Sequence, residues 1–193
     1  MSILLSLTPF ILFALLTRVA SIEMSLFAAA ALSAGLILRD RLRHGGAVKV
    51  LEAGTVILFA GLALYTLLAR ASWTVVGVRL AVDAGLFLIA LVSILIRQPF
   101  TLQFAREQVP RELWDHPRFR ATNYAITGAW TAAFAVQVLA DLVILYVPAV
   151  PFWVGVAAIV GSLAAAIWFT GWYPARQQRL GQAEAEAAQA RTR

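Results

Sequence analysis

Long apolar windows alternate with short polar breaks along almost the whole chain, and this pattern predicts a bundle of membrane-spanning helices. A helix of about 17–25 mainly apolar residues is long enough to cross the hydrocarbon core of a bilayer. Six windows fit this description, at residues 3–20, 22–38, 50–69, 75–96, 121–145 and 152–173. We therefore expect an all-α, six-helix integral membrane domain over residues 1–173, followed by a polar tail at 174–193.

The longest polar break is the segment RQPFTLQFAREQVPRELWDHPRFRATNY, between the fourth and fifth windows. Pro99, Pro110 and Pro117 divide it into short pieces, because proline disfavours helix at the residue before it and removes a helical hydrogen bond. The piece FTLQFAREQV can be helical, but its apolar side chains do not gather on one face. We expect residues 97–120 to form a structured interfacial segment that touches protein and lipid. The alternative is a docking surface for a partner.

Composition supports the membrane assignment. Hydrophobic residues make up 61% of the 193-residue chain and charged residues 13%, whereas a soluble domain has about 45–50% and 25%. A soluble fold of this length has too little interior to hide so much apolar surface. The net charge of +6 then fits polar loops beside anionic lipid headgroups, and we expect no nucleic-acid partner. The absence of cysteine excludes disulfides and thiol catalysis.

The basic residues predict how the helices are oriented. Thirteen of the 16 lysines and arginines fall on the side that holds the second loop, the fourth loop and the tail: Arg39, Arg41, Arg43, Lys49, Arg97, Arg106, Arg111, Arg118, Arg120, Arg176, Arg179, Arg191 and Arg193. Basic residues are enriched in cytoplasmic loops. The pattern therefore places both termini in the cytoplasm.

Asp83 is the clearest charge inside a predicted span. It lies about 20 Å along the helix from Arg97, at 1.5 Å per residue, and so in the outer half of the bilayer. Arg79 lies one turn earlier, where it can pair with Asp83. One interpretation is a proton-binding or substrate-binding carboxylate; the other is a self-neutralised pair whose arginine reaches the outer surface. Asp141 and Glu52 are expected at helix boundaries.

The sequence offers little catalytic material. Its two histidines, His44 and His116, both lie in predicted loops, and ELWDHP lacks a recognised metal-ligand spacing. No phosphate-binding loop or nucleophile motif is present. We therefore expect no cofactor and no metal, and favour a non-enzymatic role without excluding an enzyme.

The order of features over residues 7–175 resembles the intracellular septation protein A family of bacterial inner-membrane proteins. The resemblance begins with LTPFILFALLTRVASIEMSLFAAAAL and ends with PFWVGVAAIVGSLAAAIWF. Its most specific part is RQPFTLQFAREQVPRELWDHPRFRATNYAITGAWTAAFAV, with matching positions at Pro99, Trp114, Asn123, Trp130 and Phe134. The resemblance implies an inner-membrane protein of cell-envelope or division upkeep, and no catalytic residue.

These observations lead to two functional hypotheses. The first is a scaffold or accessory protein that contacts anionic lipid, other inner-membrane proteins or a second copy through Pro99, Arg106, Trp114, Asn123 and Trp130. The second is a small transporter or lipid-handling protein that uses Arg79 and Asp83.

Overall fold

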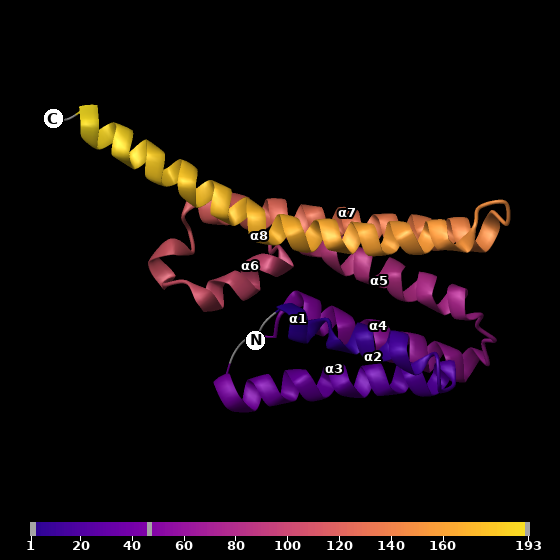
Figure 1. Ribbon diagram of the computed structural model, residues 1–193. Coiled ribbons are helices and arrows are strands. Elements are labelled where there is room, and N and C mark those ends of the chain that lie inside the picture. The colour runs from indigo at the N-terminus through magenta and orange to yellow at the C-terminus, as the bar shows by residue number, and fades with distance from the viewer. Residues whose placement is uncertain (1–2, 46–47, 192–193) are drawn as a thin grey trace.

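The computed structural model describes residues 3–45 and 48–191, and over these ranges the chain is helical without strands (Figure 1). The elements in chain order are α1 (Ile3–Ser6), α2 (Thr8–Leu16), α3 (Ile22–His44), α4 (Val50–Ala69), α5 (Val75–Leu95), α6 (Phe100–Ala105), the 3-10 turns η1 (Arg106–Gln108) and η2 (Arg111–Leu113), α7 (Pro117–Tyr146) and α8 (Phe152–Arg191). The predicted all-α class is confirmed.

Five of these helices, α3, α4, α5, α7 and α8, are long and apolar enough to cross a membrane. The expected first span at 3–20 is instead broken into α1 and α2. Pro9 lies in the first turn of α2, where it supplies no N–H and disfavours helix just before it. The nine residues of α2 extend only about 13 Å, less than half of a ~30 Å hydrocarbon core. Six full-length spans are therefore not confirmed.

The long helices run up and down, so the bundle has two distinct ends (Figure 1). One holds α6, η1 and η2, and both described chain ends lie on that side; we refer to it as the α6 end. The opposite end holds the three turns at residues 17–21, 70–74 and 147–151, and we refer to it as the hairpin end.

Local chemistry explains where the long helices start. The Ser21 hydroxyl caps α3 by accepting from the backbone N–H of Met24, and Thr74 caps α5 by accepting from that of Gly77. His116 caps α7 through Nδ1, which accepts from the backbone N–H of Arg118. Such caps satisfy backbone donors that have no helical partner. The other histidine, His44, was expected in a loop but is the last residue of α3.

Helix α8 is longer than its predicted span. It runs 40 residues through Pro174, so the described part of the polar tail is a continuation of the last helix. Pro174 has no N–H to donate to the carbonyl of Thr170, one turn earlier, and such a break in the ladder bends helices. Beyond the bundle the last turns of α8 project away from the other helices (Figure 1).

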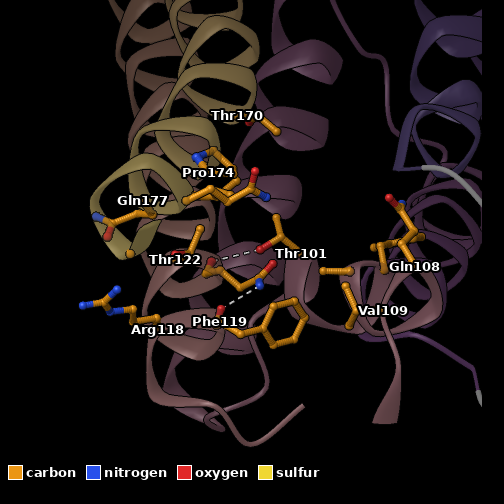
Figure 2. A pocket seen from close by; sticks show the side chains of 15 residues that line it. Thr101, Gln108, Val109, Arg118, Phe119, Thr122, Thr170, Pro174 and Gln177 are labelled. Carbon is orange, nitrogen blue, oxygen red and sulfur yellow. Dashed lines mark hydrogen bonds between the residues drawn. The ribbon is translucent and has the colours of Figure 1, made fainter. Parts of the chain in front are cut away.

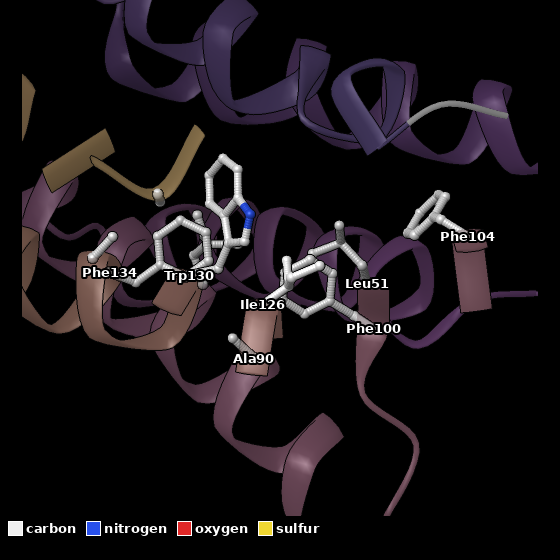
Figure 3. Packing of buried hydrophobic residues seen from close by; sticks show 10 residues of the cluster. Leu51, Ala90, Phe100, Phe104, Ile126, Trp130 and Phe134 are labelled. Atoms are coloured by element: carbon white, nitrogen blue, oxygen red, sulfur yellow. The ribbon is translucent and has the colours of Figure 1, made fainter. Parts of the chain in front are cut away.

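Two buried apolar clusters hold the helices together. One has members on each of the helices α4, α5, α6, α7 and α8, and it includes Leu86, Phe100, Ile126, Trp130 and Phe134 (Figure 3). The other joins α2 to α5 and is built from Phe13, Leu26, Ala29, Phe59, Ala63, Val78 and Val82. Helices α4 and α5 approach closely because each presents a glycine to the other. A Cβ on Gly54 would lie 2.7 Å from Ile89, and one on Gly85 would overlap Leu58.

Candidate functional site: a cavity beside a buried ion pair

A cavity of about 660 Å³ lies among α2, α5, α7 and α8. We refer to it as the hairpin-end cavity, because it reaches the end of the bundle where α5 begins. Its volume falls within the roughly 300–1,000 Å³ range of small-molecule sites. Most of the wall is apolar, and the apolar side chains include Phe10, Phe13, Leu86, Phe134, Leu163 and Ile167.

The broken first segment forms one side of this cavity. Leu7, at the break between α1 and α2, lines it together with the α2 residues Phe10, Ile11, Phe13 and Ala14. Non-helical backbone at membrane depth is tolerated where protein buries it or where it lines a cavity. Interrupted helices are also a recurring feature of membrane binding sites. The break therefore marks the same region as the cavity.

The polar lining of the cavity is concentrated near the hairpin end. It consists of Thr17, Arg18, Arg79, Asp83 and Gln137. Arg18 is exposed and forms no side-chain hydrogen bond or ion pair with the described residues. Gln137, on α7, is buried, with only 6% of its surface exposed. The cavity is thus amphipathic, with a long apolar part and a charged end.

The ion pair at this end differs from the one expected. Arg79 donates from Nε to Oδ1 of Asp141 at 2.8 Å and from Nη2 to the same oxygen, so its direct partner comes from α7. The expected partner Asp83 interacts with both charges but forms no salt bridge with Arg79. Asp141 is fully buried, which corrects its expected place at a helix boundary.

Nε2 of Gln137 is buried without a partner, and Oδ2 of Asp141 has no partner other than the neighbouring Asp83 carboxyl. A buried donor or acceptor left without a hydrogen bond costs about 1–3 kcal/mol. Arg79 also has donors to spare, since a guanidinium carries five N–H groups and Asp141 receives two of them. The cluster therefore offers hydrogen-bonding capacity that the protein itself does not use.

Three of the expected contact residues lie inside the protein. Pro99 precedes α6 and is buried. Asn123 donates from Nδ2 to the carbonyl of Phe119 at 2.9 Å, and its own carbonyl accepts from Thr101 at 2.9 Å. Trp130 is also buried. The Thr101 hydroxyl thereby ties α6 to the backbone of α7, and Asn123 and Trp130 line cavities inside the bundle.

The other two expected contact residues, Arg106 and Trp114, organise the interfacial segment. The Trp114 indole donates to the carbonyls of Arg106 at 3.1 Å and Val109 at 3.3 Å. The guanidinium carbons of Arg106 and Arg111 lie 5.3 and 5.6 Å from its ring centroid, within cation–π range. The predicted structured segment is present, and contact of these two residues with lipid or a partner stays a prediction.

A second buried charge cluster lies at the α6 end and was not singled out from the sequence. Lys49 and Glu52 are both buried, at 4% and 6% exposure, although Glu52 was expected at a boundary. Lys49 Nζ lies 2.8 Å from Glu107, 3.4 Å from Glu52 and 3.5 Å from Asp40. The feature of the sequence that could have indicated this cluster is the position of Lys49 and Glu52 at the start of the apolar window of α4.

No protein-family model, curated protein or solved structure matches the chain. The resemblance to the septation protein A family therefore stays a prediction. Among the residues that the structure describes, no group of three or more histidine, aspartate or glutamate side chains could hold a metal ion. The function is therefore inferred from the chemistry of the hairpin-end cavity.

Proposed function

We propose that the chain is a multi-pass protein of the bacterial inner membrane that binds an anionic amphiphile in the hairpin-end cavity. This is the lipid-handling alternative of the two functional hypotheses. The observation that carries it is an apolar cavity whose charged end keeps unused donors on Arg79 and Gln137. A ligand with one apolar chain and a phosphate or carboxylate head would satisfy both parts.

The charged end suits an anionic head better than a cationic one. Asp141 neutralises one side of Arg79, while the remaining N–H groups of Arg79 and those of Arg18 can donate to phosphate or carboxylate oxygens in the paired geometry that guanidinium favours. The Gln137 amide adds a donor at a buried position. Asp83 supplies the one acidic group in the lining, and it would orient the ligand by repelling the head from its own side.

The cavity also has a lateral opening through which a chain could enter from the bilayer. Ile11 on α2 and Ile167 on α8 line the cavity, yet 57% and 56% of their surfaces are exposed. Residues that face both the cavity and the outside mark its rim. If the α6 end, where Arg97, Arg106, Arg111, Arg118 and Arg120 lie, is cytoplasmic, the head of the ligand lies in the outer half of the membrane, with both termini in the cytoplasm.

Binding of hexadecyl phosphate to the protein in mild detergent tests this proposal. Ala14→Trp places a large side chain in the cavity, and we expect it to weaken binding at least about tenfold, because the apolar chain loses its space. Ala164→Trp, on an exposed position of α8 outside the cavity, is the matched control. Equal affinity in both variants, or equally tight binding of hexadecyltrimethylammonium, would contradict the proposal.

The accessory role at the other end of the bundle is kept as a second proposal. Arg111, in the turn next to Trp114, and Arg120, in the first turn of α7, have exposed side chains, which suit anionic headgroups or an acidic partner. Charge reversal of Arg111 and Arg120 should abolish function in cells while binding of hexadecyl phosphate remains unchanged. Retained function in cells would remove this second proposal.

A further inference from the structure

A second cavity of about 550 Å³ lies at the α6 end, between α6 with η1, the first turns of α7 and the second half of α8 (Figure 2). We refer to it as the α6-end cavity. Thr170 lies at one end of the set of residues drawn in Figure 2, and Arg118 and Phe119 lie at the other. Its lining is richer in amides than that of the hairpin-end cavity, with Gln108, Asn123, Gln177 and Gln178.

The two cavities follow one another along the same pair of helices. On α7, Asn123 and Ile126 line the α6-end cavity, and Trp130, Phe134 and Gln137 line the hairpin-end cavity. On α8 the order is the same. Ile159, Leu163 and Ile167 line the hairpin-end cavity, and Thr170, Pro174 and Gln177 line the other.

One pair of side chains separates them. The indole N–H of Trp130, which lines the hairpin-end cavity, donates to the hydroxyl of Thr170, which lines the α6-end cavity, at 3.0 Å. The Trp130 ring is buried and packs on Phe134 at a centroid distance of 5.7 Å, beside Ile126 (Figure 3). Ile167 and Thr170 are one turn apart on α8, about 5 Å. The barrier is therefore about one side chain thick.

Helix α8 is weakened at the same level. Pro174 cannot donate to the Thr170 carbonyl, so the helical ladder lacks one hydrogen bond immediately beside the barrier. Prolines of this kind act as bending points in long helices. A small change in the bend of α8 would move Thr170 relative to Trp130, and would thereby break the hydrogen bond that closes the path between the cavities.

We propose that the two cavities are the two halves of one passage across the membrane for the head of an anionic amphiphile, and that the Trp130–Thr170 pair is its closed barrier. The head passes from the arginines of the hairpin end to the amides of the α6 end, and the apolar chain follows through the lateral opening. This inference rests on the proposed ligand of the hairpin-end cavity.

Movement of lysophosphatidate that carries an NBD label on its single acyl chain, in phosphatidylcholine vesicles, tests the passage. Dithionite bleaches only label in the outer leaflet of a sealed vesicle, so extra bleaching measures transfer. We expect transfer in vesicles with the wild-type protein above that in protein-free vesicles. Trp130→Ala, which removes the barrier, should raise the transfer rate about tenfold, because the loss of one hydrogen bond lowers the activation barrier by about the amount that a tenfold change in rate requires.

Two milder variants cover the case in which Trp130→Ala fails to fold. Thr170→Val keeps the shape of the side chain but removes the hydroxyl that accepts from the indole, and Trp130→Phe removes the N–H. Both should raise the rate several-fold. Trp168→Ala, at an exposed position of α8, is the control and should leave the rate unchanged. A trapped dye that stays inside the vesicles shows that transfer is not leakage.

The outcomes separate the two proposals. If the wild-type protein does not bind hexadecyl phosphate, both the proposed function and this inference are overturned. Retained binding, with no transfer above protein-free vesicles in the wild type, Trp130→Ala or Thr170→Val, overturns the passage alone. An unchanged transfer rate in Thr170→Val and Trp130→Phe removes the pair as the barrier.

Discussion

The protein buries charge at both ends of its bundle, and the two clusters are satisfied to different degrees. At the α6 end, Lys49 faces the carboxylates of Asp40, Glu52 and Glu107 and lies 5.0 Å from the centre of the Phe104 ring. At the hairpin end, Arg79 donates from both Nε and Nη2 to one oxygen of Asp141. The amide nitrogen of Gln137 remains without a partner, and the second oxygen of Asp141 has only the Asp83 carboxyl beside it.

The Lys49 cluster is structural, whereas the Arg79 cluster is a candidate binding site. Among the described residues, no side-chain atom of the Lys49 cluster is buried without a hydrogen-bond partner, so this cluster is complete as it stands and joins the start of α4 to η1. The Arg79 cluster borders a cavity and keeps spare donors. Unused hydrogen-bonding capacity beside an open volume indicates a ligand, whereas saturated charge indicates stability.

The largest effect should come from Lys49→Met. Removing the ammonium leaves the buried Glu52 and its neighbours Asp40 and Glu107 without their shared partner, and breaking a buried ion pair from one side costs about 3–5 kcal/mol. Unfolding in SDS titrations measures the loss. Arg120→Met, on an exposed side chain, should change the free energy of unfolding by no more than about 0.5 kcal/mol. Equal losses in both variants would show that the Lys49 cluster is not structural.

The Arg79 cluster should behave differently when both of its charges are removed. Arg79→Met alone leaves Asp141 as a buried, unpaired carboxylate and should destabilise the fold by about 3 kcal/mol. The double variant Arg79→Met, Asp141→Leu replaces the pair by apolar groups and should recover most of that loss. Hexadecyl phosphate should bind at least about tenfold more weakly to the double variant, which is the loss of one charge-assisted hydrogen bond. Unchanged binding in a folded double variant would contradict the role of Arg79.

The spans α3, α4, α5, α7 and α8 could be predicted because hydropathy over a window depends only on local sequence. The break at Pro9 was missed because one proline hardly changes the mean hydropathy of a window, although it disfavours helix at the residue before it. The break matters, since it lines the cavity that the sequence did not reveal.

The ion pair was missed for a different reason. Asp83 lies one turn from Arg79 and was therefore the expected partner, but Asp141 is 62 residues away and reaches Arg79 only through the packing of α5 on α7. Helical spacing identifies neighbours on one helix and carries no information on which helices meet. The unpartnered state of Gln137 also depends on tertiary packing, and nothing in the sequence around it could have shown it.

Two glutamines give a matched test of saturated against unused groups. Gln103 accepts from the backbone N–H of Val50 at 2.7 Å, so Gln103→Leu should destabilise the fold by about 1–2 kcal/mol. Gln137→Leu removes a buried donor that has no partner, and we expect it to be neutral or slightly stabilising. The same Gln137→Leu change should weaken binding of hexadecyl phosphate about tenfold, whereas Gln103→Leu should not. A larger loss of stability in Gln137→Leu than in Gln103→Leu, or a larger loss of hexadecyl phosphate binding in Gln103→Leu than in Gln137→Leu, would contradict the assignment of the two clusters.

The smallest effect should be a pH dependence of the Lys49 cluster. Burial raises the pKa of Glu107, but its hydrogen bonds and the attraction of nearby positive charges, with Lys49 foremost among them, together outweigh burial and keep that pKa below the ordinary value of 4.5. For a carboxyl with a lowered pKa, the stabilisation is present above pH 4.5 and is lost as the pH falls through the folded-state value. Thermal unfolding in detergent should therefore shift to lower temperature below pH 4.5. Glu107→Gln should reduce this fall in unfolding temperature. If the variant shows the same acid dependence as the wild type, other carboxylates cause it.

Photo-crosslinking tests the central claim, that the hairpin-end cavity holds an anionic amphiphile, most directly. Hexadecyl phosphate with a diazirine on its chain is irradiated with the wild-type protein in vesicles, and the labelled residues are identified by peptide mass spectrometry. We expect label on cavity residues such as Phe10, Leu86 and Leu163, and excess unlabelled hexadecyl phosphate should displace it. Label spread evenly over exposed residues such as Leu139 and Val160, without displacement, would contradict it.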